Sequence, residues 1–252
     1  MNRLEKRKYL IGYLLSESNR HTEIPQDENE QKRMLRALLN VRPPMPVSEK
    51  FLEIQDDYLT ERKNERRVID VNKLVYTHNI ALFKGDVTTL GADAIVNAAN
   101  SAMLGCFRPN HGCIDNAIHT FAGVQLRLEC NAVMQGREAE NGEVVVTRAY
   151  NLPSRFVFHT VGPIVCGRVT KENEADLKKC YLNCLSKAEE ANLESIAFCC
   201  ISTGVFGYPK EEAALVAVKT VKEWLNKTKS DLKVVFDVFT EEDYDIYRRI
   251  LG

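Results

Sequence analysis

Two cysteines and a histidine lie within eight residues of one another near the middle of the chain. Cys106, His111 and Cys113 are separated by glycine, proline and asparagine, which are typical of tight turns. Thiolate and imidazole are the donors that zinc prefers, and three protein ligands leave one coordination position for water or substrate. The spacing therefore predicts a zinc site, with Cys106, His111 and Cys113 as the ligands.

The residues around this cluster leave two other interpretations open. Asp115 follows at once and opens an amphipathic helix, so it could be the fourth ligand of a zinc ion that only shapes the loop. Alternatively, the cysteines could pack as small apolar side chains. Because packed cysteines would not explain the histidine between them, we favour a functional metal.

Two further segments have the composition of ligand-binding loops at strand ends. One is Asn97-Ala-Ala-Asn100, and the other is Ser202-Thr203-Gly204-Val205-Phe206-Gly207. The second precedes a predicted helix, where free backbone N–H groups favour an anion and glycine allows close approach. It therefore predicts phosphate binding, although it matches neither a Walker A motif nor a Gly-x-Gly-x-x-Gly fingerprint.

The remaining thiols and imidazoles are expected to be structural. We predict burial for most of the five cysteines on apolar stripes or near a helix end, namely Cys130, Cys180, Cys184, Cys199 and Cys200. Cys166, in a glycine-rich turn, is the one further thiol that we expect to be exposed or to bind metal. His119 and His159 are expected to be structural, and no Ser-His-Asp order indicates nucleophilic catalysis.

Composition limits the kind of partner. The 252 residues include 34 Lys+Arg and 35 Asp+Glu, which excludes nucleic-acid binding through bulk charge, so a phosphate must be held by local backbone geometry. The apolar run at residues 9–15 is too short for a signal peptide, and no stretch has the length of a membrane span. We therefore expect a cytoplasmic protein with no membrane contact, in which the eight cysteines stay reduced.

The elements that position these residues fall into two regions. Residues 1–70 are rich in charge and have apolar residues at helical spacing, with breaks at Pro25 and at residues 42–46. We predict a helical N-terminal extension over 1–70 and the main domain over 71–252.

The main domain alternates strand and helix patterns. Strands are predicted at 74–82, 92–96, 143–150, 155–161, 195–201 and 233–239, with helices at 115–130, around 177–188, at 210–225 and after Thr240. This alternation predicts an α/β fold with three layers, in which helices cover both faces of a mixed, mostly parallel sheet. Ligands of such sheets bind at the carboxyl ends of the strands.

Five motifs then occur in one order within this domain. They are Gly85-Asp86-Val-Thr88, Ile95-Val-Asn97-Ala-Ala-Asn100, Ile118-His-Thr-Phe-Ala-Gly123, Phe158-His-Thr-Val-Gly162-Pro163 and Ser202-Thr-Gly-Val-Phe-Gly207-Tyr-Pro209. The series resembles the macrodomain family, MacroD-type branch, from about residue 74 to the end. The fold that this resemblance implies agrees with the alternation.

The resemblance also implies a binding site for ADP-ribose. It assigns Asp86 to the adenine amino group with the Val87 amide beside it, and Asn100 to the distal ribose, with Asn97 in the same motif. The backbone from Ser202 to Gly207 would surround the diphosphate, with Phe206 against the distal sugar. Phe239, at the end of the last strand, would stack on adenine.

The sequence departs from this branch where its members carry a polyglycine run before the active-site aspartate. Asp115 matches that aspartate, and the segment with Cys106, His111 and Cys113 replaces the glycines. This resembles a zinc-containing bacterial subgroup of mono-ADP-ribosyl hydrolases linked to sirtuin-type transferases. The resemblance implies Zn2+ as cofactor and a mono-ADP-ribosylated protein as partner. By analogy with the subgroup, that protein is expected to be a lipoyl-carrier protein.

We therefore expect a hydrolase that cleaves ADP-ribose from protein side chains, with Asp/Glu esters as the expected linkage. Asp115 would be the general base or would orient water and ribose, with Asn100 assisting. Two alternatives use the same pocket: a reader that binds ADP-ribose without cleavage, and a deacetylase of O-acetyl-ADP-ribose. A reader would need neither Asp115 nor zinc.

Overall fold

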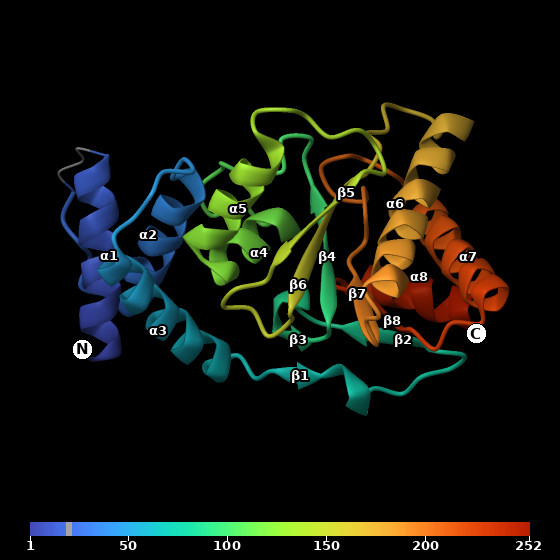
Figure 1. Cartoon of the computed structure of the whole chain (residues 1–252), viewed down its shortest axis with the longest axis horizontal. Helices are drawn as coiled ribbons and strands as arrows, with labels where there is room; N and C mark the ends of the chain where they lie inside the picture. Colours follow the sequence, from blue (N-terminus) through green and yellow to red (C-terminus); the bar gives the residue numbers. More distant parts are fainter. Residues whose placement is uncertain (19–21) are drawn as a thin grey trace.

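The computed structural model describes residues 1–18 and 22–252 and shows helices on both faces of a central sheet (Figure 1). Three helices come first: α1 (Arg3–Glu17), α2 (Glu28–Val41) and α3 (Glu49–Glu65). The sheet strands are β2 (Ile80–Lys84), β4 (Ala94–Ala99), β5 (Val144–Arg148), β6 (Phe156–Val161), β7 (Ser195–Phe198) and β8 (Lys233–Val238). The later helices are α4 (Ile114–Ala122), α5 (Val124–Met134), α6 (Lys171–Glu190), α7 (Lys210–Thr228) and α8 (Glu241–Leu251).

The sheet has six strands in the order β2-β8-β7-β4-β6-β5. Its neighbouring strands run parallel except β5, which pairs antiparallel with β6 at one edge. Two further strands, β1 (Ile69–Asp70) and β3 (Leu90–Gly91), form a separate two-stranded parallel sheet. The predicted mixed, mostly parallel sheet is confirmed.

The strands are apolar on both faces because each face packs under helices. In β8, Val234 and Phe236 belong to the core shared with α6, α7 and α8, whereas Val235 belongs to the core shared with α4 and α5. Alternate side chains of one strand point to opposite faces, so these two cores are the two outer interfaces of the three-layer α/β/α arrangement.

The helical extension packs on the α4 and α5 side of the molecule (Figure 1). Its three helices share a small core that includes Leu10, Leu35, Phe51 and Tyr58 and also takes in Val124 of α5. Val124 therefore continues the extension's core into the main domain. The chain then crosses beneath the sheet through β1 before β2 begins (Figure 1). The boundary near residue 70 remains a prediction.

Several predicted boundaries were wrong. The segment predicted as one helix over 115–130 is two helices, because Gly123 has φ +95 and ends the first. The strand predicted over 74–82 begins only at Ile80, and β7 ends at Phe198, so Cys199 and Cys200 lie beyond it. The strand predicted over 92–96 extends to Ala99, so Asn97 lies within β4 and not in a loop.

Among the residues that the structure describes, no helix combines the length and apolar character needed to span a membrane.

Candidate active site

The side chains of Cys106, His111 and Cys113 converge in the loop before α4. One donor atom from each lies within 4.8 Å of the others, and the Cys106 Sγ is 3.4 Å from the His111 Nδ1. Tetrahedral zinc with bonds of about 2.3 Å to sulfur and 2.0 Å to nitrogen would separate these two donors by about 3.6 Å. The donor set and its spacing therefore fit a zinc ion.

The loop can make this arrangement because it has no helix or strand between residues 104 and 113 and turns through two left-handed residues in that stretch. Gly105 has φ +84 and Asn110 has φ +53, conformations that glycine and asparagine adopt most readily. Cys113 is the N-cap residue of α4, so the third donor lies at a helix start. The positive end of the helix favours a thiolate there, but burial raises the pKa of the Cys113 thiol to about 12, so a bound metal is needed to hold the thiolate form.

Asp115 lies in the first turn of α4, outside the three-residue donor group. Its Oδ1 accepts a hydrogen bond from the Asn97 Nδ2 at 2.8 Å, and its Oδ2 lies 3.5 Å from the Asn100 Nδ2. The residue is 5% exposed, and burial raises the pKa of the carboxyl group to about 6, opposed by the bond from Asn97. The carboxyl group is thus held by two amides from the end of β4.

The two asparagines have different surroundings. Asn100 is partly buried, and its Nδ2 also donates to the Gly105 carbonyl at 3.1 Å, which ties the Asp115 contact to the start of the loop. Asn97 is 0% exposed, and its Nδ2 also lies 3.0 Å from the His159 Nδ1. In this structure the Asn97 amide therefore links the Asp115 carboxyl group to the buried His159. The contact of Asn97 with a ligand stays a prediction.

Two histidines lie beneath Asp115. His119 Nε2 is 3.6 Å from the Asp115 Oδ1, but burial holds the pKa of the His119 imidazole well below its usual range, so the pair is not an ion pair. Burial likewise lowers the pKa of His159 to about 3.

His119, Cys130 and His159 form a second group with metal-donor spacing. The His159 Nδ1 accepts from Asn97, so its Nε2 carries the proton and faces the Thr147 Oγ1 at 3.0 Å. Both ring nitrogens of His159 are thus engaged by side chains of the core. This buried group is therefore better explained as part of the core. His159 makes the hydrogen bonds expected of a structural histidine, whereas neither ring nitrogen of His119 has a hydrogen-bond partner among the described residues.

The loop after β7 has the geometry of an anion site. The Gly207 N–H donates to the Gly204 carbonyl at 3.0 Å, and the Tyr208 N–H donates to the Ser202 carbonyl at 3.0 Å, which curls the loop. The backbone N–H groups of Thr203, Gly204, Val205 and Phe206 have no hydrogen-bond partner within the described part of the chain. Successive free N–H groups in such a turn form a concave site for an oxyanion.

Residues of this loop differ in exposure. Val205 is 72% exposed, whereas Ser202 is buried in a left-handed conformation with its Oγ beside Gly162, where a Cβ would lie 2.1 Å from that oxygen. Phe206 packs against a small core that includes Ala99 and Met103. Phe206 thus connects this loop to the end of β4, close to Asn100.

The predicted adenine residues lie at the ends of two paired strands. Lys84 of β2 pairs with Val238 of β8, so Asp86 and Phe239 follow adjacent strand ends, and Phe239 is 77% exposed. Asp86 caps the short helix Val87–Thr89 through a bond from the Thr88 N–H at 2.9 Å. An accepting carboxylate and an exposed aromatic ring therefore occupy one corner of the sheet.

Arg66 is a neighbour that the sequence did not reveal. It comes from the end of α3, and its guanidinium donates to the Asp86 Oδ2 at 2.5 Å and packs over the Phe121 ring at 3.6 Å. Arg66 and Asp86 are 20 residues apart with β1 and β2 between them, so no local pattern could have indicated the pair. The extension therefore contributes a side chain beside the predicted adenine site.

Comparison with known proteins gives a consistent result. Residues 96–217 match the family model described as Macro domain. The chain is 48% identical to a protein-ADP-ribose hydrolase of Treponema medium over 100% of both chains, and 45% identical to one of Staphylococcus aureus over 98% of this chain and 97% of that one. It is similar in structure to the Trypanosoma brucei macrodomain in complex with ADP-ribose, with a TM-score of 0.68, 32% identity and coverage of 86% and 95%.

Proposed function

The chain belongs to the macrodomain family, and on that premise we propose that it is a zinc-dependent hydrolase that removes mono-ADP-ribose from modified proteins. Relatives that match it from end to end are named protein-ADP-ribose hydrolases. The observation that carries the proposal is the Asp115 carboxyl group, buried, held by Asn97 and Asn100, and two residues from the cysteine–histidine cluster.

ADP-ribose would lie along the carboxyl edge of the sheet. The adenine would meet Asp86, the Val87 amide and Phe239 at the β2 and β8 end. The diphosphate would accept from the free N–H groups between Thr203 and Phe206. The distal ribose would then reach Asn100 and Phe206, which lie near the end of β4. In this order the reacting sugar would lie at Asp115.

Zinc would be held by Cys106, His111 and Cys113, whose donor spacing fits it. When bound there, zinc lowers the pKa of coordinated water and polarises oxygen groups. Asp115 would accept a proton from the attacking water or orient that water, while Asn97 keeps the carboxyl group in place. Asn100 would hold a ribose hydroxyl.

We infer that an ester between ADP-ribose and an Asp or Glu side chain is the substrate linkage. The water oxygen bonds to the anomeric carbon of the distal ribose and keeps one hydrogen as the new hydroxyl group of ADP-ribose. The bond from that carbon to the side-chain oxygen breaks, its electron pair stays on the protein carboxylate, and the second proton of the water passes to Asp115 and then to solvent. A carboxylate is a good leaving group, so one general base suffices for this linkage. The protein partner would be a modified carrier such as a lipoyl-carrier protein, in a cytoplasm that keeps both cysteines reduced.

The experiment that tests this function uses carriers with one defined linkage each: an Asp/Glu ester, a serine linkage or an arginine linkage. We expect free ADP-ribose to appear with the ester carrier and to depend on Asp115. Tight binding of ADP-ribose without any release from the three carriers would identify a reader and contradict hydrolysis. Release of acetate from O-acetyl-ADP-ribose, with intact protein conjugates, would instead identify a deacetylase.

A further inference from the structure

Helix α2 of the extension contacts the loop that carries the metal donors. The Arg36 Nη2 donates to the His111 carbonyl at 3.1 Å and to the Asn116 Oδ1 at 2.7 Å, and the Arg36 Nε donates to the same Oδ1 at 3.0 Å. Asn116 is fully buried, and its Nδ2 donates to the Arg108 carbonyl at 3.0 Å. Arg36 therefore holds His111 directly and Arg108 through Asn116.

A second residue of α2 holds the position between them. The Asn40 Oδ1 accepts from the Asn110 N–H at 2.9 Å, and the Asn40 Nδ2 donates to the Thr120 Oγ1 at 3.0 Å. Asn40 is almost completely buried, so these bonds are shielded from competing water. Asn110 is the left-handed residue just before His111, and its backbone conformation sets the direction in which the histidine leaves the turn.

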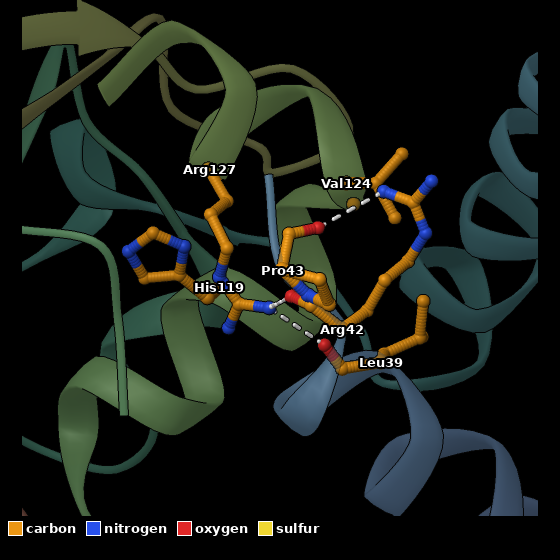
Figure 2. A pocket seen from close by; sticks show the side chains of 7 residues that line it. Leu39, Arg42, Pro43, His119, Val124 and Arg127 are labelled. Carbon is orange, nitrogen blue, oxygen red and sulfur yellow. Dashed lines mark hydrogen bonds between the residues drawn. The ribbon is translucent and has the colours of Figure 1, made fainter. Parts of the chain in front are cut away.

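The other end of the loop is fixed to the same helix by Arg127 of α5. Its guanidinium donates to the carbonyl oxygens of Leu39 and Arg42, as Figure 2 shows, and to that of Asn40 at 3.1 Å. It also donates to the Leu104 carbonyl at 2.7 Å and lies 4.5 Å from the centre of the Phe107 ring. A buried cation thus joins the carbonyl end of α2 to the start of the metal loop.

The loop itself has little internal support. Its own backbone bonds include one from the His111 N–H to the Arg108 carbonyl at 3.2 Å. A cavity of only about 10 Å³ lies between the end of α2 and helices α4 and α5, so these elements are closely packed (Figure 2). It is lined by Leu39, Arg42, Pro43, His119, Gly123, Val124 and Arg127. The positions of Cys106 and His111 therefore depend on α2 and on the residues that join α2 to the loop.

We propose that α2 positions the metal-binding loop, with Arg36 and Asn40 as positioning residues for His111. This inference rests on the zinc site proposed above. Metal binding and docking of the extension are then coupled. Docking of α2 raises the association constant for zinc, and bound zinc raises the equilibrium constant for docking of α2 by the same factor. The extension is in this view required for metal affinity and not only for stability.

The first test measures zinc affinity by competition with a chromophoric chelator, using the full-length chain. We expect Arg36→Met to weaken zinc binding by about tenfold or more, as observed when outer partners of metal ligands are removed. Arg36→Lys keeps one donor and should fall between Arg36→Met and the wild type. Arg33→Met is the matched control, because Arg33 is exposed on the same helix and makes no hydrogen bond or ion pair within the described residues. We expect it to bind zinc as the wild type does.

A spectroscopic signature separates positioning from general destabilisation. Substitution with Co2+ gives thiolate charge-transfer and ligand-field bands that report the coordination geometry, and we expect Arg36→Met to alter them while Arg33→Met does not. Equal zinc affinity and equal spectra for Arg36→Met and the wild type would overturn the inference while leaving the zinc site intact. A wild type that binds no zinc would instead overturn the proposed function.

Limited proteolysis of the wild type keeps the inference testable even where Arg36→Met fails to fold. We expect cleavage within α2 to slow several-fold when zinc is added to chelated protein. Cleavage within α7, on the other side of the sheet, should change little and serves as the internal control. Equal cleavage rates of α2 with and without zinc would contradict the coupling.

Discussion

The Asn97 side-chain amide donates to the Asp115 Oδ1 at 2.8 Å, and this bond joins the end of β4 to the first turn of α4. Asn97 is fully buried, so the bond is not exposed to competing water. A donor that faces the carboxylate also stabilises its ionised form against the effect of burial. The strand thus orients the carboxyl group that we assign to catalysis and opposes the effect of burial on its pKa.

Asp115→Asn should lose hydrolysis and keep binding. Asparagine has nearly the same shape but cannot accept a proton from water, so we expect the rate of ADP-ribose release to fall by at least about 100-fold. The affinity for free ADP-ribose, measured by calorimetry, should change by less than about threefold, because the adenine and diphosphate contacts lie elsewhere. A variant that cleaves at the wild-type rate would remove Asp115 from the mechanism.

Replacing a metal donor should remove zinc and activity together. In Cys106→Ala and in His111→Ala we expect less than a tenth of the wild-type zinc content and of the hydrolysis rate, since two ligands hold zinc poorly. Cys166→Ser is the control, because that thiol is exposed and lies outside the metal-donor groups. Full activity in a metal-free protein, checked by atomic absorption after chelation, would contradict the zinc role.

Asp86 should determine the preference for adenine. The analogue with hypoxanthine in place of adenine has a carbonyl oxygen where adenine has its amino group, so the wild-type carboxylate should bind it about 10- to 100-fold more weakly than ADP-ribose. Asp86→Asn keeps the shape and supplies an N–H donor. In a binding titration we expect Asp86→Asn to reduce or invert the preference for ADP-ribose over the hypoxanthine analogue. Unchanged discrimination in the variant would exclude Asp86 from base recognition.

Stability should decline in acid partly because of His159. The pKa of this imidazole is lowered by burial from 6.5 to about 3, so between these values the unfolded chain binds a proton that the folded chain does not. The contribution of neutral His159 to the free energy of unfolding is then fully present above pH 6.5. It is lost as the pH falls, by about 2 kcal/mol between pH 7 and pH 5. Urea unfolding of metal-free protein at both pH values measures this loss.

His159→Gln provides the comparison for this experiment. The groups that face the imidazole are Asn97 of β4, Thr147 of β5, Cys130 of α5 and His119 of α4. The pKa of His119 is lowered chiefly by burial and to a smaller extent by His159; since His119 is present in both proteins, most of its effect cancels. We expect the loss between pH 7 and pH 5 to be smaller by about 2 kcal/mol in His159→Gln. Equal losses in the two proteins would show that His159 titrates normally.

The architecture followed from the sequence because buried strands and amphipathic helices leave strong local patterns. Alternation of the two predicted a three-layer α/β/α sheet, which is confirmed, and burial was correct for Cys180 and Cys184. Element ends were less predictable. Gly123 breaks a helix that apolar spacing alone would continue, and β4 extends through Asn97 to Ala99 because its backbone pairs with β6 over that length.

The candidate site was predictable only where its residues are close in the chain. The group formed by Cys106, His111 and Cys113 is visible within eight residues, and its donors do converge. Arg66, which pairs with Asp86, and Arg36, which pairs with Asn116, join segments 20 and 80 residues apart. Charged residues of the extension have the same local pattern whether they face solvent or the main domain, so the sequence could not show these contacts.

A crystal structure with bound ADP-ribose, measured at the zinc absorption edge, tests the central claim most directly. We expect one strong anomalous peak within bonding distance of Cys106, His111 and Cys113, next to the distal ribose and the Asp115 carboxyl group. A peak far from that sugar, or none at these three side chains in protein purified without chelator, would contradict the account and reduce the site to nucleotide recognition.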